Sequence, residues 1–255
     1  MFFDSHAHFD DKRFDCDRDE ILLSMARNGI SNIVNIGADI ESSKSTVKLA
    51  EKYDFIYAAV GVHPHDVKDM NEGMLSGIAE LSRNKKVVAI GEIGLDYYYD
   101  NSPRDTQKYW FEKQMELAYE LKLPVVIHSR DATEDTIKIC SENKIHGGII
   151  HCFSGSVESA KIFLDLGYHI SFAGPVTFKN ARNLPEVAKI VPEDRLLIET
   201  DCPYMAPEPH RGERNSSIFV RHVAEKLAEI RGVSVEHIAN ITSDNARKLF
   251  NIKEI

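Results

Sequence analysis

Short apolar runs alternate with longer amphipathic segments along most of the chain. Eight runs are apolar almost throughout and rich in β-branched residues, which predicts buried strands; they span residues 1–6, 33–36, 55–60, 87–90, 125–128, 148–151, 168–172 and 196–201. After each run, apolar residues recur every three or four positions, which predicts helices; these span residues 17–28, 41–52, 73–84, 104–122, 131–142, 157–166, 181–190 and 218–231. Two short helices, over 235–240 and 243–250, are expected to follow.

Eight strands that alternate with eight helices predict an α/β fold with a parallel (β/α)₈ TIM barrel. The alternative is an open, doubly wound sheet. The 255 residues suit one barrel of this kind. No low-complexity tract, composition shift or Pro/Ser-rich linker interrupts the pattern, so we expect a single domain over residues 1–255.

Polar residues of metal-binding type collect where the predicted strands end. They are His6 and His8 at the first strand, His63 and His65 at the third, Glu92 at the fourth, His128 at the fifth, His151 at the sixth and Asp201 at the eighth. In a barrel, all of these positions lie at the C-terminal end, where active sites of the fold are found. Any one of these histidines alone suits a core or loop position, but their coincidence with strand ends predicts a metal site.

The number of these residues predicts two divalent ions. Four imidazoles and two carboxylates exceed the three protein ligands of a usual catalytic zinc. Glu92 lies between the two sets in strand order and has two oxygens, so it is the expected bridge. The expected sets are His6, His8 and Asp201 for one ion, and His128 with His151 for the other. Such a site favours a bridging hydroxide and a phosphate.

The chemistry of the expected ligands indicates which metals they bind, and the positions of the acidic residues suggest further roles for them. Imidazole-rich ligation suits Zn, Mn, Fe, Co or Ni better than Mg, which prefers oxygen. Asp201 is also a candidate general base, and Glu92 shares the catalytic role through the ions. Glu199 precedes Asp201 by two residues on the same face. It is expected either to orient a ligand or to form a salt bridge with Arg195 or Arg130 inside the barrel.

Composition narrows the class of protein. A net charge of −9 excludes a general nucleic-acid coat, which needs an excess of Lys and Arg, but it leaves room for a small site acting on a phosphodiester. The four cysteines form no Cys-x-x-Cys pair, so neither a zinc ribbon nor a disulfide scaffold is indicated. No signal peptide and no apolar run of ~20 residues is visible, which predicts a cytoplasmic location without membrane association. No heptad or exposed apolar stripe indicates an obligate protein partner.

Six ordered motifs resemble those of the TatD family of metal-dependent deoxyribonucleases, within the amidohydrolase-like barrels. They are Ser5-His6-Ala7-His8, Gly61-Val62-His63-Pro64-His65, Gly91-Glu92-Ile93-Gly94-Leu95-Asp96, His128-Ser129-Arg130-Asp131, His151-Cys152-Phe153-Ser154-Gly155 and Thr200-Asp201-Cys202-Pro203-Tyr204. The resemblance runs from Asp4 to about Asn215. It implies a barrel that cleaves phosphodiester bonds as a 3′–5′ exonuclease on single-stranded DNA, and on RNA as a further substrate. It also implies the same six metal ligands.

The resemblance places His63 and His65 at the substrate phosphate, where they can donate hydrogen bonds to a non-bridging oxygen. The alternative is that Pro64 only stiffens this loop. Arg130, Arg211 and Asn215 are further candidates for holding phosphate. The run Tyr97-Tyr98-Tyr99 suits either base stacking or packing over the barrel end. Ser216-Ser217 departs from the Glu-Pro often found there in the family, which leaves this edge of the substrate site undefined.

Two other functions compete with the nuclease. One is a hydrolase of a small ester, lactone, amide or phosphotriester on the same scaffold, because a fold alone does not decide the substrate. The other is a metal-binding protein without catalysis, which is disfavoured because structural sites close their coordination sphere. His63, His65, Arg211 and Asn215 favour an anionic substrate.

Overall fold

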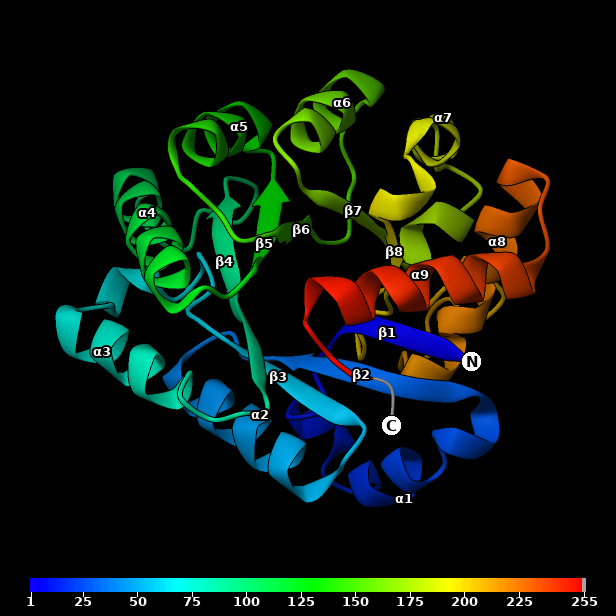
Figure 1. The fold of residues 1–255 in the computed structure, drawn as a ribbon, viewed down its shortest axis with the longest axis horizontal. Coiled ribbons are helices and arrows are strands. Elements are labelled where there is room, and N and C mark those ends of the chain that lie inside the picture. The colour runs from blue at the N-terminus through cyan, green and yellow to red at the C-terminus, as the bar shows by residue number, and fades with distance from the viewer. Residues whose placement is uncertain (254–255) are drawn as a thin grey trace.

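A computed structural model of the chain describes residues 1–253, and Figure 1 shows its fold. Within these residues, eight parallel strands form one sheet in chain order. They are β1 (Phe2–Ala7), β2 (Ile30–Ile36), β3 (Ile56–Val60), β4 (Val87–Asp96), β5 (Val125–Arg130), β6 (Gly148–Ile150), β7 (His169–Phe172) and β8 (Leu196–Ile198). The described strands therefore confirm the predicted parallel barrel over the open doubly wound sheet.

Helices surround the strands, and α1 to α8 each follow the strand of the same number (Figure 1). They are α1 (Arg18–Leu23), α2 (Ile40–Lys52), α3 (Glu72–Leu81), α4 (Arg104–Leu121), α5 (Thr133–Glu142), α6 (Val157–Asp165), α7 (Leu184–Ile190), α8 (Val220–Arg231) and the additional α9 (Val235–Leu249). Short 3₁₀ turns cover Lys12–Phe14, Ala26–Asn28, Val67–Asp69, Gly174–Thr177, Glu193–Arg195 and Ser217–Phe219. None of the helices between residues 1 and 253 is both long and apolar enough to cross a bilayer.

The barrel closes between β1 and the segment that follows β8. Ala7 forms a parallel bridge with Cys202, and the backbone N–H of His8 donates to the carbonyl of Cys202 at 2.8 Å. The backbone N–H of Asp201 donates to the carbonyl of His6 at 2.9 Å. Closure therefore brings the two histidines at the end of the first strand beside Asp201, nearly two hundred residues later.

The inside of the barrel is filled by apolar side chains from its strands and from α9. Strand residues such as Phe3, Val34 and Leu197 pack there against Phe250 and Ile252, which follow α9. The rings of Phe3 and Phe250 stack with centroids 6.2 Å apart. In Figure 1, α9 lies across β1 and β8. It closes the N-terminal end of the barrel, which leaves the C-terminal end for polar residues.

The prediction of two short C-terminal helices is wrong, because α9 is continuous from Val235 to Leu249. The polar side chains near the expected break both have hydrogen-bond partners, one inside the helix and one at the start of the chain. The hydroxyl of Thr242 donates to the carbonyl of Ile238 at 2.8 Å, and the hydroxyl of Ser243 donates to the carbonyl of Met1 at 3.2 Å. Thr242 thus bonds one turn back, as Thr does inside helices, and Ser243 fastens the helix to the residue before β1, so neither side chain interrupts α9.

The predicted first helix, over 17–28, is shorter in the structure. It ends at Leu23, and a 3₁₀ turn covers Ala26–Asn28. Ser24 follows the helix, and its hydroxyl and backbone N–H both donate to the carbonyl of Ile21, a tight pattern that does not continue an α-helix. Gly29 adopts the left-handed conformation, with φ 79°, expected of the residue after a helix end.

Strand β4 extends six residues beyond its predicted end and reaches Asp96. Gly94 makes this possible, because its φ of 138° is rarely adopted by other residues and a Cβ there would lie 2.0 Å from the carbonyl oxygen of His128. The two residues are partners in the β4–β5 register. The close approach places the end of β4 directly beside the histidine of β5. Strand β8 instead ends early, at Ile198, and the chain turns at Asp201 with φ 56°.

Acid should destabilise this barrel partly through His169 in β7. The side chain is 8% exposed, and burial, with a smaller contribution from Arg195, lowers its pKa from 6.5 to about 4. Between pH 6.5 and 4, the imidazole therefore binds a proton more readily in the unfolded chain than in the folded one. The contribution of His169 to the stability of the fold is complete above about pH 6.5 and is lost as the pH falls towards 4. Between pH 7 and pH 5, the free energy of unfolding of metal-free His169→Gln, measured in urea, should fall by about 2 kcal/mol less than that of the wild type.

The exposed His146 supplies the control for this measurement, because His146→Gln removes an imidazole that is not buried. Its unfolding should keep the pH dependence of the wild type. The same loss of stability in His169→Gln as in the wild type would show that another group carries the effect.

Candidate metal centre

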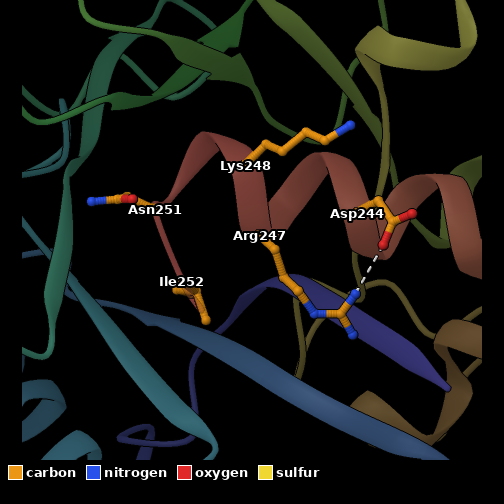
Figure 2. Close-up of a pocket in the computed structure, with 5 residues that line it drawn as sticks. All are labelled: Asp244, Arg247, Lys248, Asn251 and Ile252. Carbon is orange, nitrogen blue, oxygen red and sulfur yellow. Dashed lines mark hydrogen bonds and ion pairs between the residues drawn. The ribbon is translucent and has the colours of Figure 1, made fainter. Parts of the chain in front are cut away.

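The pocket on α9 shown in Figure 2 lies at the opposite end of the barrel from the predicted ligands. Its lining is Asp244, Arg247, Lys248, Asn251 and Ile252. Arg247 points towards Asp244, and Arg247 Nη1 lies 3.1 Å from Asp244 Oδ1 (Figure 2). Helix α9 packs at the N-terminal ends of the strands, whereas the predicted ligands lie in the C-terminal halves of the strands or beyond their ends. This pocket therefore does not contain the candidate site.

Glu92, buried near the middle of β4, faces two pairs of histidines with its two carboxylate oxygens. Glu92 Oε2 lies 3.5 Å from His6 Nε2 and 3.8 Å from His8 Nε2. Glu92 Oε1 lies 2.9 Å from His128 Nδ1 and 2.8 Å from His151 Nε2. The carboxylate thus stands between two sets of nitrogen donors, one set for each oxygen.

Asp201 joins the first of these pairs. Its Oδ1 lies 3.3 Å from His8 Nε2 and 3.6 Å from His6 Nε2. The two inward nitrogens of the first pair are 3.1 Å apart, and those of His128 and His151 are 3.2 Å apart. The structure therefore brings all six predicted ligands together, divided as three residues and two residues around Glu92.

Most of these histidines have a fixed orientation. Three use the outer ring nitrogen in a hydrogen bond to an oxygen of the chain: His8 Nδ1 to Ile36 O at 2.9 Å, His128 Nε2 to Asp96 Oδ2 at 3.1 Å, and His151 Nδ1 to Glu199 Oε1 at 3.2 Å. When the outer nitrogen carries the proton, the inner nitrogen presents a lone pair to the centre. Lone pairs that converge in this way fit a cation, and this arrangement of outer oxygens is typical of metal-binding histidines.

The two carboxylates keep their charge at neutral pH. Burial acts to raise the pKa of Glu92, but the imidazoles around it, His151 foremost, outweigh burial and hold its pKa well below the usual range. Burial likewise acts to raise the pKa of Asp201, and the hydrogen bond with His8 and the nearby His6 lower it below its usual value. Two anionic carboxylates among imidazoles form a nitrogen and oxygen donor set that suits divalent first-row metals.

Sequence reasoning missed Asp4, which is buried at the start of β1. Its carboxylate accepts hydrogen bonds from the backbone N–H and hydroxyl of Thr200, at 2.9 and 2.6 Å, and from the hydroxyl of Ser217 at 2.5 Å. It thereby ties β1 to the segment that carries Asp201. An acid two residues before His6, on the same face of a buried strand, was the available signal.

Asp96 was noted in its motif but not as a site residue. Its Oδ2 accepts from His65 Nε2 at 2.9 Å as well as from His128, and its Oδ1 accepts the backbone N–H groups of Tyr98 and Tyr99 at 3.0 and 2.9 Å. Asp96 thus holds one candidate ligand and one candidate phosphate donor. The signal was its spacing, because residues 92, 94 and 96 share one face of a strand.

The sequence left two roles open for Glu199, to orient a metal ligand or to form a salt bridge, and its contacts in the structure distinguish them. Its Oε1 accepts from His151 and from the backbone N–H of Cys152 at 2.7 Å, and among the described residues it forms no salt bridge with Arg195 or Arg130. Glu199 Oε2 is buried and makes no hydrogen bond to the described part of the chain. The structure therefore favours the orienting position over the salt bridge.

His63 also lies against the cluster, with its Nε2 3.5 Å from Glu92 Oε1. Burial lowers the pKa of His63 to about 4, so the imidazole is neutral at pH 7. Its Nδ1 accepts the backbone N–H of His65 at 3.2 Å, which leaves the proton on Nε2. His63 therefore presents a hydrogen-bond donor to the cluster, and the neighbouring His65 is held by Asp96.

The remaining candidate substrate residues lie outside this cluster. Asn215 is buried, and its Nδ2 donates to the carbonyls of Thr200 and Tyr204 at 2.8 and 2.7 Å, which supports the loop of Asp201. The guanidinium of Arg211 lies over the ring of Phe178, 3.9 Å from its centroid, and that of Arg130 lies over Tyr98 at 4.0 Å. A role of these three residues towards phosphate stays a prediction.

Comparisons with known proteins identify the family of this chain. Residues 3–251 match the model of the family described as TatD related DNase. The uncharacterized metal-dependent hydrolase YabD of Bacillus subtilis is 48% identical over 254 residues, which cover 99% of this chain and all of that protein. The 3′-5′ ssDNA/RNA exonuclease TatD of Rahnella sp. is 35% identical over 256 residues, with 97% of each chain covered.

A solved structure shows the same architecture. The crystal structure of YjjV, a TatD homolog from Escherichia coli K12, superposes with a TM-score of 0.93 at 32% sequence identity. The match covers 99% of this chain and 98% of that one. Both the strand order and the helices that surround it are therefore shared along nearly the whole length.

Proposed function

Because the chain belongs to the TatD-related DNase family and is a metal-dependent hydrolase, we propose that it cleaves the phosphodiester bonds of single-stranded DNA from the 3′ end, with RNA as a further substrate. The observation that carries the proposal is the placement of Glu92 between two sets of nitrogen donors. The relative named as a 3′-5′ ssDNA/RNA exonuclease, similar over nearly its whole length, supports the choice of substrate.

We propose that Glu92 bridges two divalent ions. His6, His8 and Asp201 would hold one ion, and His128 with His151 would hold the other. When bound, two such ions supply Lewis acidity at a phosphoryl oxygen and make water a nucleophile at neutral pH. The imidazole-rich donor set favours Zn, Mn, Co or Ni over Mg.

The side chains around the proposed ions have separate roles in the proposed reaction. Asp201 stays ionised at neutral pH, so its carboxylate can take the proton of the attacking water as a general base. His63 can donate its Nε2 proton to a non-bridging phosphate oxygen, since its other nitrogen already accepts a hydrogen bond. Asp96 keeps His65 beside His63 through the hydrogen bond to its Nε2. Buried histidines and carboxylates are thus arranged before the substrate binds.

Metal-stripped protein should leave end-labelled single-stranded DNA intact, and adding Mn²⁺, Zn²⁺, Co²⁺ or Ni²⁺ should restore cleavage, with Mg²⁺ less effective. A 5′ label should give a descending ladder, whereas a 3′ label should be released as mononucleotide at once. Gel electrophoresis of the time course reads both results.

Circular single-stranded DNA is the control for this experiment, because an exonuclease has no end to attack on it. Failure of the metal-loaded protein to shorten linear DNA, with turnover of a carboxylic ester or a phosphotriester, would contradict the proposal. The function would then be that of a small-ester hydrolase on the same scaffold.

A further inference from the structure

Two clusters of tyrosine and arginine lie beside the candidate metal centre. In the β4–β5 cluster, the guanidinium of Arg130 lies over the rings of Tyr98 and Tyr99, 4.0 and 4.8 Å from their centroids. In the β8–β1 cluster, the guanidinium of Arg13 lies over the ring of Tyr204 at 4.1 Å. Each cluster combines an aromatic face with a cation.

Each cluster contacts histidines of the site. The ring of Tyr99 packs edge-on against His65, with centroids 5.3 Å apart. The ring of Tyr204 packs edge-on against His8, with centroids 6.0 Å apart. The clusters therefore border the candidate centre directly.

The strand order places the two clusters on opposite sides of that centre. The first follows the ends of β4 and β5, and the second follows the ends of β1 and β8. In a closed barrel whose strands run in chain order, the junction of β8 with β1 faces the junction of β4 with β5. Glu92 and its histidines lie between them.

The tyrosines of both clusters are unusually exposed for their size: Tyr98, Tyr99 and Tyr204 expose 58%, 54% and 44% of their surface. Arg130 makes no side-chain hydrogen bond or ion pair within residues 1–253, and the two rings are what hold its guanidinium. Arg13 is instead paired with Asp11, with Nη2 to Oδ2 at 2.8 Å. Exposed rings beside an arginine without an anionic partner are suited to a planar, anionic ligand.

A single strand of nucleic acid has this chemistry. Its bases stack on exposed aromatic rings without regard to sequence, and its phosphates accept hydrogen bonds from guanidinium groups. A duplex keeps its bases paired and cannot offer one to each side of the barrel. A small ester has no group that would extend to either cluster.

We infer that the two clusters are stacking subsites for the two bases that flank the bond to be cleaved. The strand crosses the metal centre from one cluster to the other, with Tyr98 and Tyr99 on one side and Tyr204 on the other. Arg130 then holds a phosphate next to the scissile one. This inference rests on the proposed function, and it adds that the substrate needs a base on each side of the scissile bond.

Tyrosine substitutions test the inference by binding and by turnover. Tyr99→Ala and Tyr204→Ala should each weaken the binding of a fluorescent single-stranded oligonucleotide to metal-stripped protein by about tenfold, measured by anisotropy. The value of kcat/KM on the same oligonucleotide, with metal, should fall by a similar factor. Tyr204→Phe keeps the ring and loses only its hydroxyl contact with Asp11, so it should bind as the wild type does.

Tyr109→Ala is the matched control. Tyr109 is 48% exposed on the outer helix α4, and Lys113 Nζ lies 6.0 Å from the centroid of its ring. It resembles the cluster tyrosines in exposure and in its neighbouring cation, but the ring contacts found for it within residues 1–253 are with Trp110 and Lys113 and not with a histidine of the site. Its substitution should change neither binding nor turnover.

Abasic substrates assign each base to its ring. With the wild type, removing the last or the penultimate base should each lower kcat/KM about tenfold. In Tyr204→Ala one of these two losses should disappear, and in Tyr99→Ala the other. Full losses from both abasic positions in both variants would overturn the inference, as would variants that bind and cleave like Tyr109→Ala while the wild type degrades DNA. No cleavage by metal-loaded wild type would overturn the proposed function as well.

Discussion

Glu92→Ala should reduce the metal-dependent cleavage of single-stranded DNA by at least about a thousandfold. Lewis-acid stabilisation of a phosphoryl group contributes several kcal/mol, and each 1.36 kcal/mol is a factor of ten in rate. Glu92 is the side chain in contact with both histidine pairs, so its loss removes the proposed bridge and leaves each ion with fewer ligands. The remaining donors cannot substitute for it, because they belong to one pair or the other.

Measuring the rate of DNA cleavage and the metal content of the same protein preparations tests this prediction. After dialysis against a weak chelator, the wild type should retain two ions per chain and Glu92→Ala fewer than two, measured by mass spectrometry of the elements. Glu120→Ala, which removes an exposed carboxylate on α4, should behave as the wild type. A Glu92→Ala protein with two bound ions and an unchanged rate would show that Glu92 does not act as the bridge.

Glu199→Gln should weaken the binding of metal by about 10–100-fold, the usual consequence of removing a carboxylate behind a metal-binding histidine. His6 and His151 stack with centroids 4.1 Å apart and planes 13° apart. Ligand atoms of these two residues and of Glu199 all lie within 4.8 Å of one another. Glu199 therefore stands behind His151 and lies close to His6 of the other pair. Glutamine keeps the shape but loses the charge that favours a proton on the outer nitrogen.

Competitive titration with a metal indicator measures this effect, and thermal unfolding of metal-stripped protein separates it from a loss of stability. The expected result is weaker binding with an apo unfolding temperature close to that of the wild type. Glu193→Gln, an exposed substitution in the 3₁₀ turn before β8, is the control. Unchanged affinity with a lowered unfolding temperature would mean that Glu199 only supports the fold.

Much of the site was predictable because it follows from strand periodicity. His6 and His8 alternate along β1, and Glu92, His128 and His151 follow apolar runs whose ends meet in a parallel barrel. The same reasoning predicts the eight strands, since buried parallel strands leave long apolar runs in the sequence. Position along the chain was therefore enough to indicate which side chains converge.

Residues that act through hydrogen bonds were not predictable in this way. Asp4 bonds to Thr200, 196 positions away, and Asp96 bonds to His128, 32 positions away. Periodicity says which face a side chain occupies but not which polar group it meets there. Asn215 is a further example. From the sequence, its amide suits a phosphate, but in the structure the amide donates to two backbone carbonyls. The continuity of α9 was missed in the same way, because Ser243 near the expected break donates to the carbonyl of Met1, 242 positions away.

The packing of α9 against β1 has a consequence for the growing chain. Phe3 packs against Phe250 and Ala246 inside the barrel. The first strand therefore cannot complete its packing until Ala246, 243 positions later in the chain, has been synthesised. At ~5–20 residues per second, synthesis of that interval takes about 10–50 s. For most of this time His6 and His8 lack Asp201, and throughout it no closed barrel surrounds them. An ion that meets the nascent chain finds its ligands incomplete or not yet brought together, so we expect tight binding only after the barrel has closed.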